Sequence, residues 1–199
     1  MKIAIIDYGV GNLRSVEKGL EYVGVPSRVT ADPADIDAAD AIVLPGVGAY
    51  ESGMRQIEPL KKVVLDRVNE GAPLLGICLG MQMLYDESEE GGIIRGLGLV
   101  RGRVTRFSNG LKVPHMGWNS LSIAREHPLL KGIPDSSFVY FVHSFRADVG
   151  DDTVASSDYG GDFTAIVASR ELNVAGTQFH PEKSGETGLR MLKNFAGMI

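Results

Sequence analysis

The single cysteine of the chain, Cys78, lies where a reactive thiol is expected. The apolar run Pro73–Ile77 predicts a buried strand before it, and Leu79–Tyr85 predicts a helix after it. A nucleophile in such a turn adopts strained backbone angles, while Gly76 and Gly80 let the neighbouring backbone pass. The N-terminus of the helix favours a thiolate. A lone cysteine is more often a small buried hydrophobe, so Cys78 alone leaves both interpretations open.

A second motif lies far downstream, where the predicted strand Val174–Phe179 runs into His180, Pro181 and Glu182. The carboxyl ends of parallel strands meet in one crevice, whatever their separation in sequence. His180 could therefore face Cys78 as a general base, with Glu182 holding its imidazole in one tautomer. An isolated histidine is usually a polar loop residue, but the proline and the carboxylate that follow this one favour a catalytic role.

A third motif, Pro45–Gly48, follows the apolar run Ala41–Leu44. Two glycines beside a proline form a turn whose amide hydrogens can point into the crevice. The backbone amides of Val47 or Gly48, together with that of Leu79, would form an oxyanion hole for a tetrahedral intermediate. On its own, such a turn is simply a connection between a strand and a helix.

Together these motifs resemble those of the class I glutamine amidotransferases, which hydrolyse glutamine to glutamate and pass the ammonia to a partner. The segments that carry this likeness are Gly76–Gln82 and Phe179–Glu182. Other segments resemble the glutaminase subunits of imidazole glycerol phosphate synthases in histidine biosynthesis: Asp7–Ser15, Pro114–Asn119, Tyr140–Ser144 and Gln178–Ser184. The likeness covers the whole chain, and it implies a type 1 glutamine amidotransferase domain over residues 1–199.

The resemblance also implies which residues act and which bind. It assigns a catalytic triad of Cys78, His180 and Glu182, with hydrolysis through a thioester on the cysteine. It further assigns side-chain or backbone contacts with glutamine to four residues: Gly48, Gln82, Ser144 and Phe145.

The implied partner is a cyclase subunit folded as a (β/α)₈ barrel, joined to this chain in a heterodimer. The residues that the resemblance places at the interface or the ammonia exit are Asn12, Trp118, Tyr140 and Lys183. Trp118 follows Gly117 in a segment that reads as a turn. A single tryptophan is most often a core residue, but an exposed one is a natural anchor in a partner's pocket.

Three rival functions are weighed against this one. The segments Pro114–Asn119 and Tyr140–Ser144 argue against amidotransferase subunits that serve pyridoxal phosphate, anthranilate or guanylate synthesis. A scaffold without activity would be expected to lose Cys78 or His180. A cysteine hydrolase on an α/β-hydrolase sheet would place its acid before its histidine, whereas Glu182 comes after His180.

The bulk composition is that of a globular protein of 199 residues, 44% hydrophobic and 23% charged. With a formal charge of −5 and no basic cluster, we expect no nucleic-acid partner. No apolar stretch approaches the ~20 residues of a membrane span. Met1 and Lys2 lead straight into an apolar run, so we expect no export signal. A single cysteine fits a reducing cytoplasm.

No cofactor or metal is expected, because His115, His127 and His143 lack the spacing of metal ligands. We expect His127 to be exposed in a loop and His143 to hold backbone in place at the end of a strand. Asp7–Asn12 lacks the residues of a phosphate-binding loop and reads as a glycine-rich connection.

The chain alternates strands and helices, which predicts a single α/β domain with a mostly parallel open sheet and helices on both faces. The expected strands are Lys2–Asp7, Ala41–Leu44, Pro73–Ile77 and Val174–Phe179, and the expected helices are Leu13–Tyr22, Ile57–Asn69, Leu79–Tyr85 and Gly188–Phe195. Shorter runs predict additional, partly antiparallel strands: Val100–Phe107, Phe138–Val142 and Thr164–Ala168. Glu87–Gly92 reads as a solvated loop.

Overall fold

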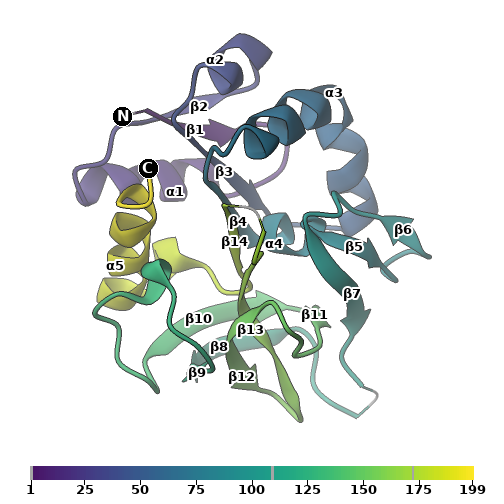
Figure 1. The fold of residues 1–199 in the computed structure, drawn as a ribbon. Coiled ribbons are helices and arrows are strands. Elements are labelled where there is room, and N and C mark those ends of the chain that lie inside the picture. Colours follow the sequence, from purple (N-terminus) through teal and green to yellow (C-terminus); the bar gives the residue numbers. More distant parts are fainter. Residues whose placement is uncertain (1, 109, 172) are drawn as a thin grey trace.

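An eight-stranded sheet runs through the centre of the computed structural model, which describes residues 2–108, 110–171 and 173–199 (Figure 1). The expectation of no export signal rests in part on Met1, which lies outside these residues. Five neighbouring strands are parallel, in the spatial order β2 (Ser27–Thr30), β1 (Ile3–Ile6), β3 (Ala41–Gly46), β4 (Leu74–Cys78) and β14 (Val174–Thr177). Three antiparallel strands extend the sheet beyond β14: β13 (Asp162–Ala168), β12 (Thr153–Asp158) and β9 (Ser122–Ile123). The predicted fold class is confirmed.

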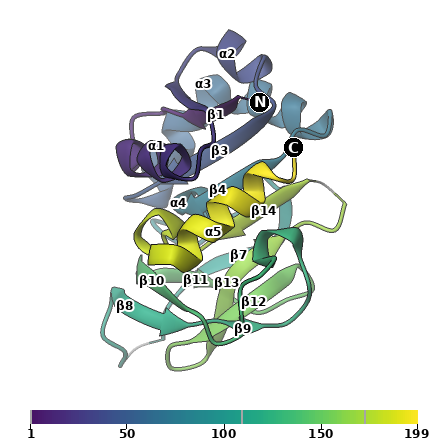
Figure 2. The ribbon, with the colours of Figure 1, turned by 90° about the vertical axis from the view of Figure 1, so that its left-hand side faces the viewer.

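Helices cover both faces of the parallel half (Figures 1 and 2). One face carries α1 (Leu13–Tyr22) and α5 (Gly185–Ala196), and the other carries α2 (Pro33–Asp37), α3 (Tyr50–Asn69) and α4 (Leu79–Met83). Successive side chains of a strand point to opposite faces, so a strand covered on both faces must be apolar throughout. In β1, Ile3 and Ile5 pack into the core under α1 and α5, whereas Ala4 and Ile6 pack into the core under α3.

Two smaller sheets lie beside the central one. The first is a ribbon of β8 (His115–Ser120) and β10 (Phe138–His143), paired antiparallel with Trp118 opposite Tyr140. The second has the order β11 (Phe145–Ala147), β7 (Val100–Arg106), β5 (Tyr85–Ser88) and β6 (Ile94–Arg95). Short 3₁₀ turns occur at Pro128–Leu130 and Pro181–Lys183.

Helix α1 has the predicted bounds, but α3 begins at Tyr50 and not at Ile57. Gly53 and Pro59 interrupt the helical pattern of the sequence, but α3 runs through both. The backbone amide of Tyr50 donates to the Glu90 side chain at 3.0 Å, which satisfies one of the free amides at the start of the helix. A Cβ atom at Gly53 would lie 3.1 Å from the side chain of Leu79, so this glycine allows α3 and α4 to pack closely.

Three further local predictions are wrong. The helix expected over Leu79–Tyr85 ends at Met83, and Tyr85 begins β5. Trp118 lies inside strand β8 and not in a turn, because the pairing with β10 comes from residues far along the chain. Glu87 and Ser88 belong to β5, and Ser88 is fully buried, so the expected loop begins only after it. Between β1 and α1, Gly9 and Gly11 have positive φ, as expected of a glycine-rich connection.

No helix within residues 2–108, 110–171 and 173–199 has both the length and the apolar character needed to cross a membrane.

Candidate active site

Cys78 is the last residue of β4 and directly precedes α4. Its φ of 53° and ψ of −107° lie outside the regions that side-chain-bearing residues normally adopt, which is the strain expected of a nucleophile on a sharp turn. A Cβ atom at Gly80 would lie 1.8 Å from the carbonyl oxygen of Leu44, and one at Gly76 would lie 2.7 Å from that of Gly80. The predicted strand–turn–helix geometry is therefore confirmed, and it requires both glycines.

Three neighbouring parallel strands bring the predicted motifs together. Strand β4 lies between β3 and β14, so the segments after all three strands leave from the same edge of the sheet. His180 follows β14, and its Nδ1 lies 2.8 Å from Oε1 of Glu182. The side chains of His180 and Glu182 are 2% and 0% exposed. Because the carboxylate only accepts, Nδ1 carries the proton and Nε2 is left to act as a base.

The electrostatics of His180 favour an imidazolium. Burial lowers its pKa, but contacts with Cys78 and Glu182 more than offset this and raise the pKa to about 9. The buried Nε2 atom has no hydrogen-bond partner of regular geometry among the described residues. The arrangement can therefore take a proton from a thiol and hold the resulting positive charge.

Asn12 contacts the acid of this pair. Its Nδ2 donates to Glu182 Oε1 at 3.3 Å, and its Oδ1 accepts from Ser15 Oγ at 2.8 Å. Asn12 directly precedes α1, so the first βα connection holds the carboxylate that orients the histidine. The family resemblance places Asn12 near the partner, and the sequence gives no signal for this contact, which joins residues 170 positions apart.

The turn expected to supply the oxyanion hole, Pro45–Gly48, is held by a hydrogen bond from Tyr8. Tyr8 is buried, and its hydroxyl donates to the carbonyl of Pro45 at 2.6 Å. Burial, with a smaller contribution from Cys78, raises the pKa of Tyr8 well above its usual value, so the hydroxyl stays a donor. Gly48 has a φ of 107°, which an L-residue adopts only with strain, and Val47 is 40% exposed. The role of Tyr8 was not predicted.

A pocket of about 380 Å³ opens beside Cys78. Its lining contains all four residues predicted to contact glutamine, the predicted oxyanion residues and two of the three predicted catalytic residues: Val47, Gly48, Cys78, Leu79, Gln82, Ser144, Phe145 and His180. Glu182, which contacts His180, is not part of the lining. Glu90, Pro114, Val142 and His143, which were not predicted as site residues, also line it. The volume of this pocket is at the lower end of those found for small-molecule sites, which fits a ligand the size of an amino acid.

Gln82 and Gln178 form a buried hydrogen-bond chain under the pocket. Nε2 of Gln82 donates to the carbonyl of Phe145 at 3.0 Å and to Oε1 of Gln178 at 3.1 Å. Nε2 of Gln178 in turn donates to the Cys78 sulphur at 3.8 Å. Gln178 was not predicted as a site residue, although it opens Gln178–Ser184, one of the segments that carry the family likeness.

The residues predicted to meet a partner lie near the triad and differ in exposure. Trp118 is 56% exposed, its ring meets that of Tyr140 edge-on at 6.0 Å, and Lys183 is also exposed. Tyr140 and Asn12 are half-buried. The amide of His180 donates to the carbonyl of Tyr140 at 3.0 Å, which ties this strand to the triad segment.

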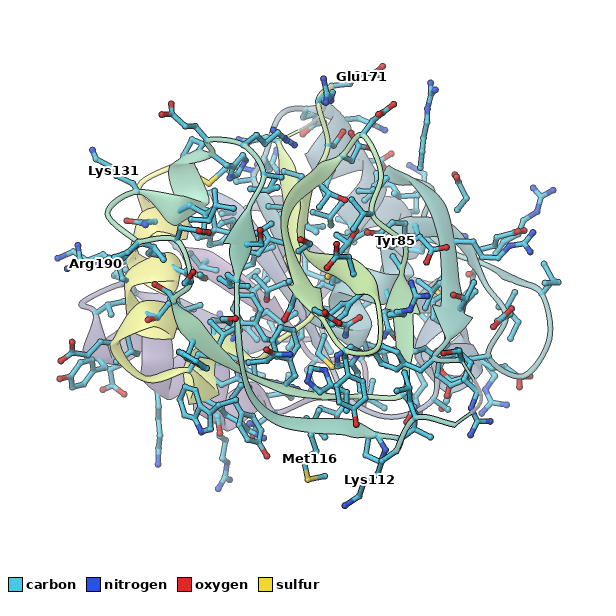
Figure 3. The ribbon with its side chains drawn as sticks, turned by 90° about the horizontal axis from the view of Figure 1, so that it is seen from below. Tyr85, Lys112, Met116, Lys131, Glu171 and Arg190 are labelled. Atoms are coloured by element: carbon cyan, nitrogen blue, oxygen red, sulfur yellow. The ribbon has the colours of Figure 1, made fainter. Side chains whose placement is uncertain are left out.

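Two further apolar side chains extend the exposed face of this ribbon. Met116 and Phe138 are 62% and 60% exposed, and Met116 points outward from the lower side of the molecule in Figure 3. Both lie an even number of residues from Trp118 or Tyr140 along their own strands, so the four side chains share one face. We call Met116, Trp118, Phe138 and Tyr140 the ribbon face.

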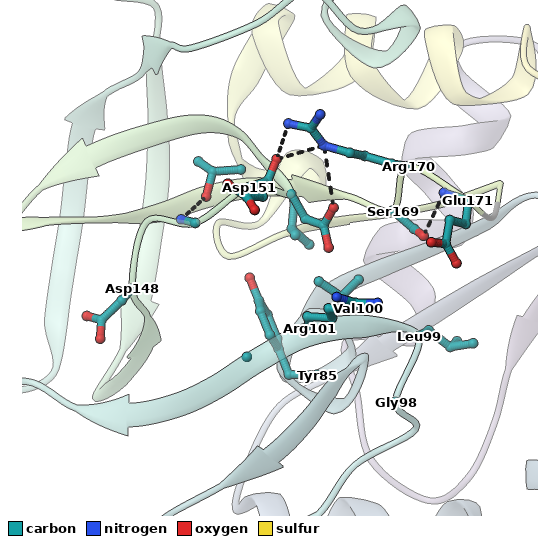
Figure 4. Close-up of a pocket in the computed structure, with 15 residues that line it drawn as sticks. Tyr85, Gly98, Leu99, Val100, Arg101, Asp148, Asp151, Ser169, Arg170 and Glu171 are labelled. Carbon is teal, nitrogen blue, oxygen red and sulfur yellow. Dashed lines mark hydrogen bonds and ion pairs between the residues drawn. The ribbon is translucent and has the colours of Figure 1, made fainter.

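A second hollow of about 450 Å³ contains neither Cys78 nor His180 (Figure 4). Arg170 crosses it and donates to the carbonyl of Asp151 at 2.8 Å, and it lies 4.0 Å from the carboxylate of Asp152. Arg170 thus ties the segment after β13 to the turn that contains Asp151 and Asp152.

No group of three or more metal-ligating side chains occurs in the part of the chain that the structure describes. His127 is half-buried and accepts from the amide of Leu129 at 3.2 Å, so the expectation of an exposed loop histidine is wrong. His143 contacts the carbonyl of Phe145 at 2.8 Å, as expected of a residue that holds backbone.

Comparison with known proteins places the chain among relatives along its full length. The family model described as Glutamine amidotransferase class-I matches residues 4–198. "Imidazole glycerol phosphate synthase subunit HisH" of Methanosarcina acetivorans is 56% identical, over 99% of this chain and 98% of that protein. The protein of the same name from Bacillus cereus is 51% identical, over 99% and 95%.

Solved structures with lower identity share the fold. The structure of PurLQS from Thermotoga maritima matches with a TM-score of 0.80 at 20% identity, over 98% of this chain and 97% of that chain. A putative GMP synthase subunit from Thermoplasma acidophilum matches with a TM-score of 0.76 at 23% identity, over 100% and 93%. From its family match and from relatives more than half identical over nearly its whole length, the chain belongs to the class I glutamine amidotransferases.

Proposed function

We propose that this chain is the glutaminase subunit of an imidazole glycerol phosphate synthase. The observation that carries the proposal is the convergence of Cys78, the His180–Glu182 pair and the Val47–Gly48 turn on one pocket. The names of the relatives that are more than half identical over nearly the full chain support the same synthase. They also support a partner subunit. We propose that this partner is a cyclase with a (β/α)₈ barrel, and that the chain acts in the cytoplasm without a cofactor.

In the proposed reaction, Cys78 attacks the side-chain amide carbon of glutamine. His180 takes the thiol proton through Nε2 and then delivers it to the departing ammonia, and Glu182 stabilises the imidazolium in between. Backbone amides of Val47 or Gly48, with that of Leu79, stabilise the oxyanion. Water then hydrolyses the glutamyl thioester, with His180 acting as the base.

Glutamine selectivity is assigned to the far side of the same pocket. Gln82 and the backbone of Ser144 and Phe145 would contact the amino-acid head group, while Gly48 lies next to the reacting amide. Because the Gln82 amide nitrogen is already committed to two acceptors, its Oε1 is the atom available to a ligand's ammonium group.

The partner would dock beside the triad. The ribbon face presents large exposed side chains, and Asn12 and Lys183 lie on segments that contact or contain Glu182. Ammonia released at Cys78 would have to leave past these segments to reach an acceptor in the barrel, where imidazole glycerol phosphate and aminoimidazole carboxamide ribonucleotide would form.

The proposal is tested by reconstitution with a purified cyclase subunit. We expect Cys78→Ala to abolish glutamine-dependent synthesis of imidazole glycerol phosphate and to leave ammonium-dependent synthesis within about twofold, because only ammonia production needs the thiol. Equal loss of both activities would contradict the division of labour. Stimulation of glutamine hydrolysis by the acceptor subunit of an anthranilate or guanylate synthase, and not by the cyclase, would overturn the assignment of the pathway.

A further inference from the structure

Two buried histidines outside the triad lie at the candidate glutamine pocket, and one of them, His143, is part of its lining. His115 on β8 and His143 on β10 are directly opposite each other, and they are 4% and 5% exposed. Nδ1 of His115 lies 3.0 Å from Nε2 of His143. Nδ1 of His143 lies 2.8 Å from the carbonyl oxygen of Phe145, and Nε2 of His115 lies 3.4 Å from Nδ2 of Asn119.

The groups at the two ends of this series of hydrogen bonds, the Phe145 carbonyl and the Asn119 amide, determine which ring nitrogens carry a proton. The Phe145 carbonyl only accepts, so Nδ1 of His143 carries a proton and donates it. In a neutral ring Nε2 is then an acceptor, so Nδ1 of His115 must donate to it. Nε2 of His115 is likewise an acceptor, and the Asn119 amide donates to it. One order satisfies all three contacts, and it requires both rings to be neutral.

The surroundings keep the rings neutral. His115 lies between two aromatic rings, with centroids 4.1 Å from Tyr159 and 5.0 Å from Phe141. Burial lowers its pKa to about 4. Burial is also the main reason that the pKa of His143 falls to about 3, although its bond to a carbonyl opposes the shift.

Three positive or ionisable groups face His143 and add to this effect. His115, His180 and Arg146 each lower the pKa of His143. A charged His143 would put a second donor against Nδ1 of His115 and break the order. The pair is therefore a fixed set of dipoles and not a proton shuttle at neutral pH.

This series of hydrogen bonds ends at the carbonyl oxygen of Phe145, a residue that also lines the pocket. The Phe145 carbonyl accepts from His143 at 2.8 Å and from Gln82 at 3.0 Å, which occupies both of its lone pairs. We propose that His115 and His143 are positioning residues: they fix the Phe145 carbonyl, and through it they hold Gln82 in the orientation that binds glutamine. This inference rests on the function proposed above.

This series of hydrogen bonds from Asn119 through His115 and His143 to Phe145, which we call the relay, connects the pocket with the ribbon face. Asn119 is adjacent to Trp118 in β8, so the hydrogen bonds run without a gap from a residue next to the proposed anchor to the carbonyl that holds Gln82. Each link is buried or half-buried, which strengthens the dipoles and penalises any broken contact.

The test measures glutamine affinity apart from catalysis, by calorimetry on the full chain with the cyclase in a Cys78→Ala background. We expect His143→Phe, which keeps an aromatic ring but removes both nitrogens, to weaken L-glutamine binding at least tenfold. His143→Asn should recover most of this loss, because its amide can donate from the position of Nδ1. Phe163→Leu is the matched control: it disturbs the ring packing around His143 without touching the relay, and should change affinity less than threefold.

A second measurement keeps the inference testable if a variant unfolds. Long-range ¹H–¹⁵N NMR spectra of the unsubstituted chain at pH 7 should show both rings neutral with the proton on Nδ1. A proton on Nε2, or a charged ring, would overturn the proposed order. Equal affinity of His143→Phe and Phe163→Leu for glutamine would overturn the positioning role while leaving the glutaminase proposal intact. Failure of the Cys78→Ala chain itself to bind glutamine would instead contradict the proposed function.

Discussion

Gly80 lies directly against the backbone of Leu44, so that a Cβ atom at Gly80 would be 1.8 Å from the Leu44 carbonyl oxygen. This contact joins the start of α4 to β3, the strand that leads into the proposed oxyanion turn. The nucleophile and the turn thus share one backbone contact that only glycine permits.

Gly80→Ala should therefore destabilise the chain by at least ~2 kcal/mol, because the clash is with backbone that cannot rotate away. Gly150→Ala is the control: nothing lies within 4 Å of its added Cβ and its φ is not positive, so the change should stay within ~0.5 kcal/mol. Urea unfolding measures both. Equal free energies of unfolding for the two variants would mean that the turn relaxes freely.

His180→Asn should lower the kcat of glutamate release by at least ~10²-fold, as expected for loss of a general base. Glu182→Gln should lower it less, since Glu182 orients the ring 2.8 Å away and does not transfer the proton. The double variant should fall little below His180→Asn alone, because members of one catalytic unit are not additive. A Glu182→Gln variant that is slower than His180→Asn would reverse the two roles.

Trp118→Ala should weaken binding of the cyclase by at least ~2 kcal/mol, or about 30-fold in Kd, because large exposed aromatics act as anchors. Its melting temperature should be unchanged, since more than half of the side chain is already in solvent. Tyr22→Ala removes an aromatic side chain that is 79% exposed at the far end of α1, and it should leave affinity unchanged. Calorimetric titration and thermal melts separate these effects, and a lower melting temperature with unaltered affinity would make Trp118 a structural residue.

Stability should fall as the pH drops from about 6.5 toward 3, because of His143. In the unfolded chain it binds a proton near pH 6.5, whereas in the folded chain its pKa is about 3, so the unfolded state holds the extra proton in this window. One such group costs about 1 kcal/mol of unfolding free energy between pH 6 and pH 5. His143→Phe should remove that share, as measured by urea unfolding at both pH values. The same slope in both chains would contradict a neutral His143.

The sequence alone determined the elements that neighbouring residues control. The strands β3, β4 and β14 are buried on both faces, so each appears in the sequence as a short apolar run. The glycines around Cys78 are needed for one sharp turn, so they too can be recognised within a few residues. These local signals were sufficient for the α/β fold and for the candidate triad, because parallel strands deliver their ends to one edge of a sheet.

Only the tertiary structure decided the contacts between distant segments. Strands β8 and β10 pair across a long connection, so the sequence around Trp118 predicts a turn, and only the pairing with β10 shows that Trp118 lies in a strand. The relay from His115 to Phe145, the bond from Gln178 to Cys78, and the contact of Asn12 with Glu182 each join segments that carry no periodic signal. A hydrogen bond depends on where two chain segments meet in space, and that meeting is set by the packing of the whole domain.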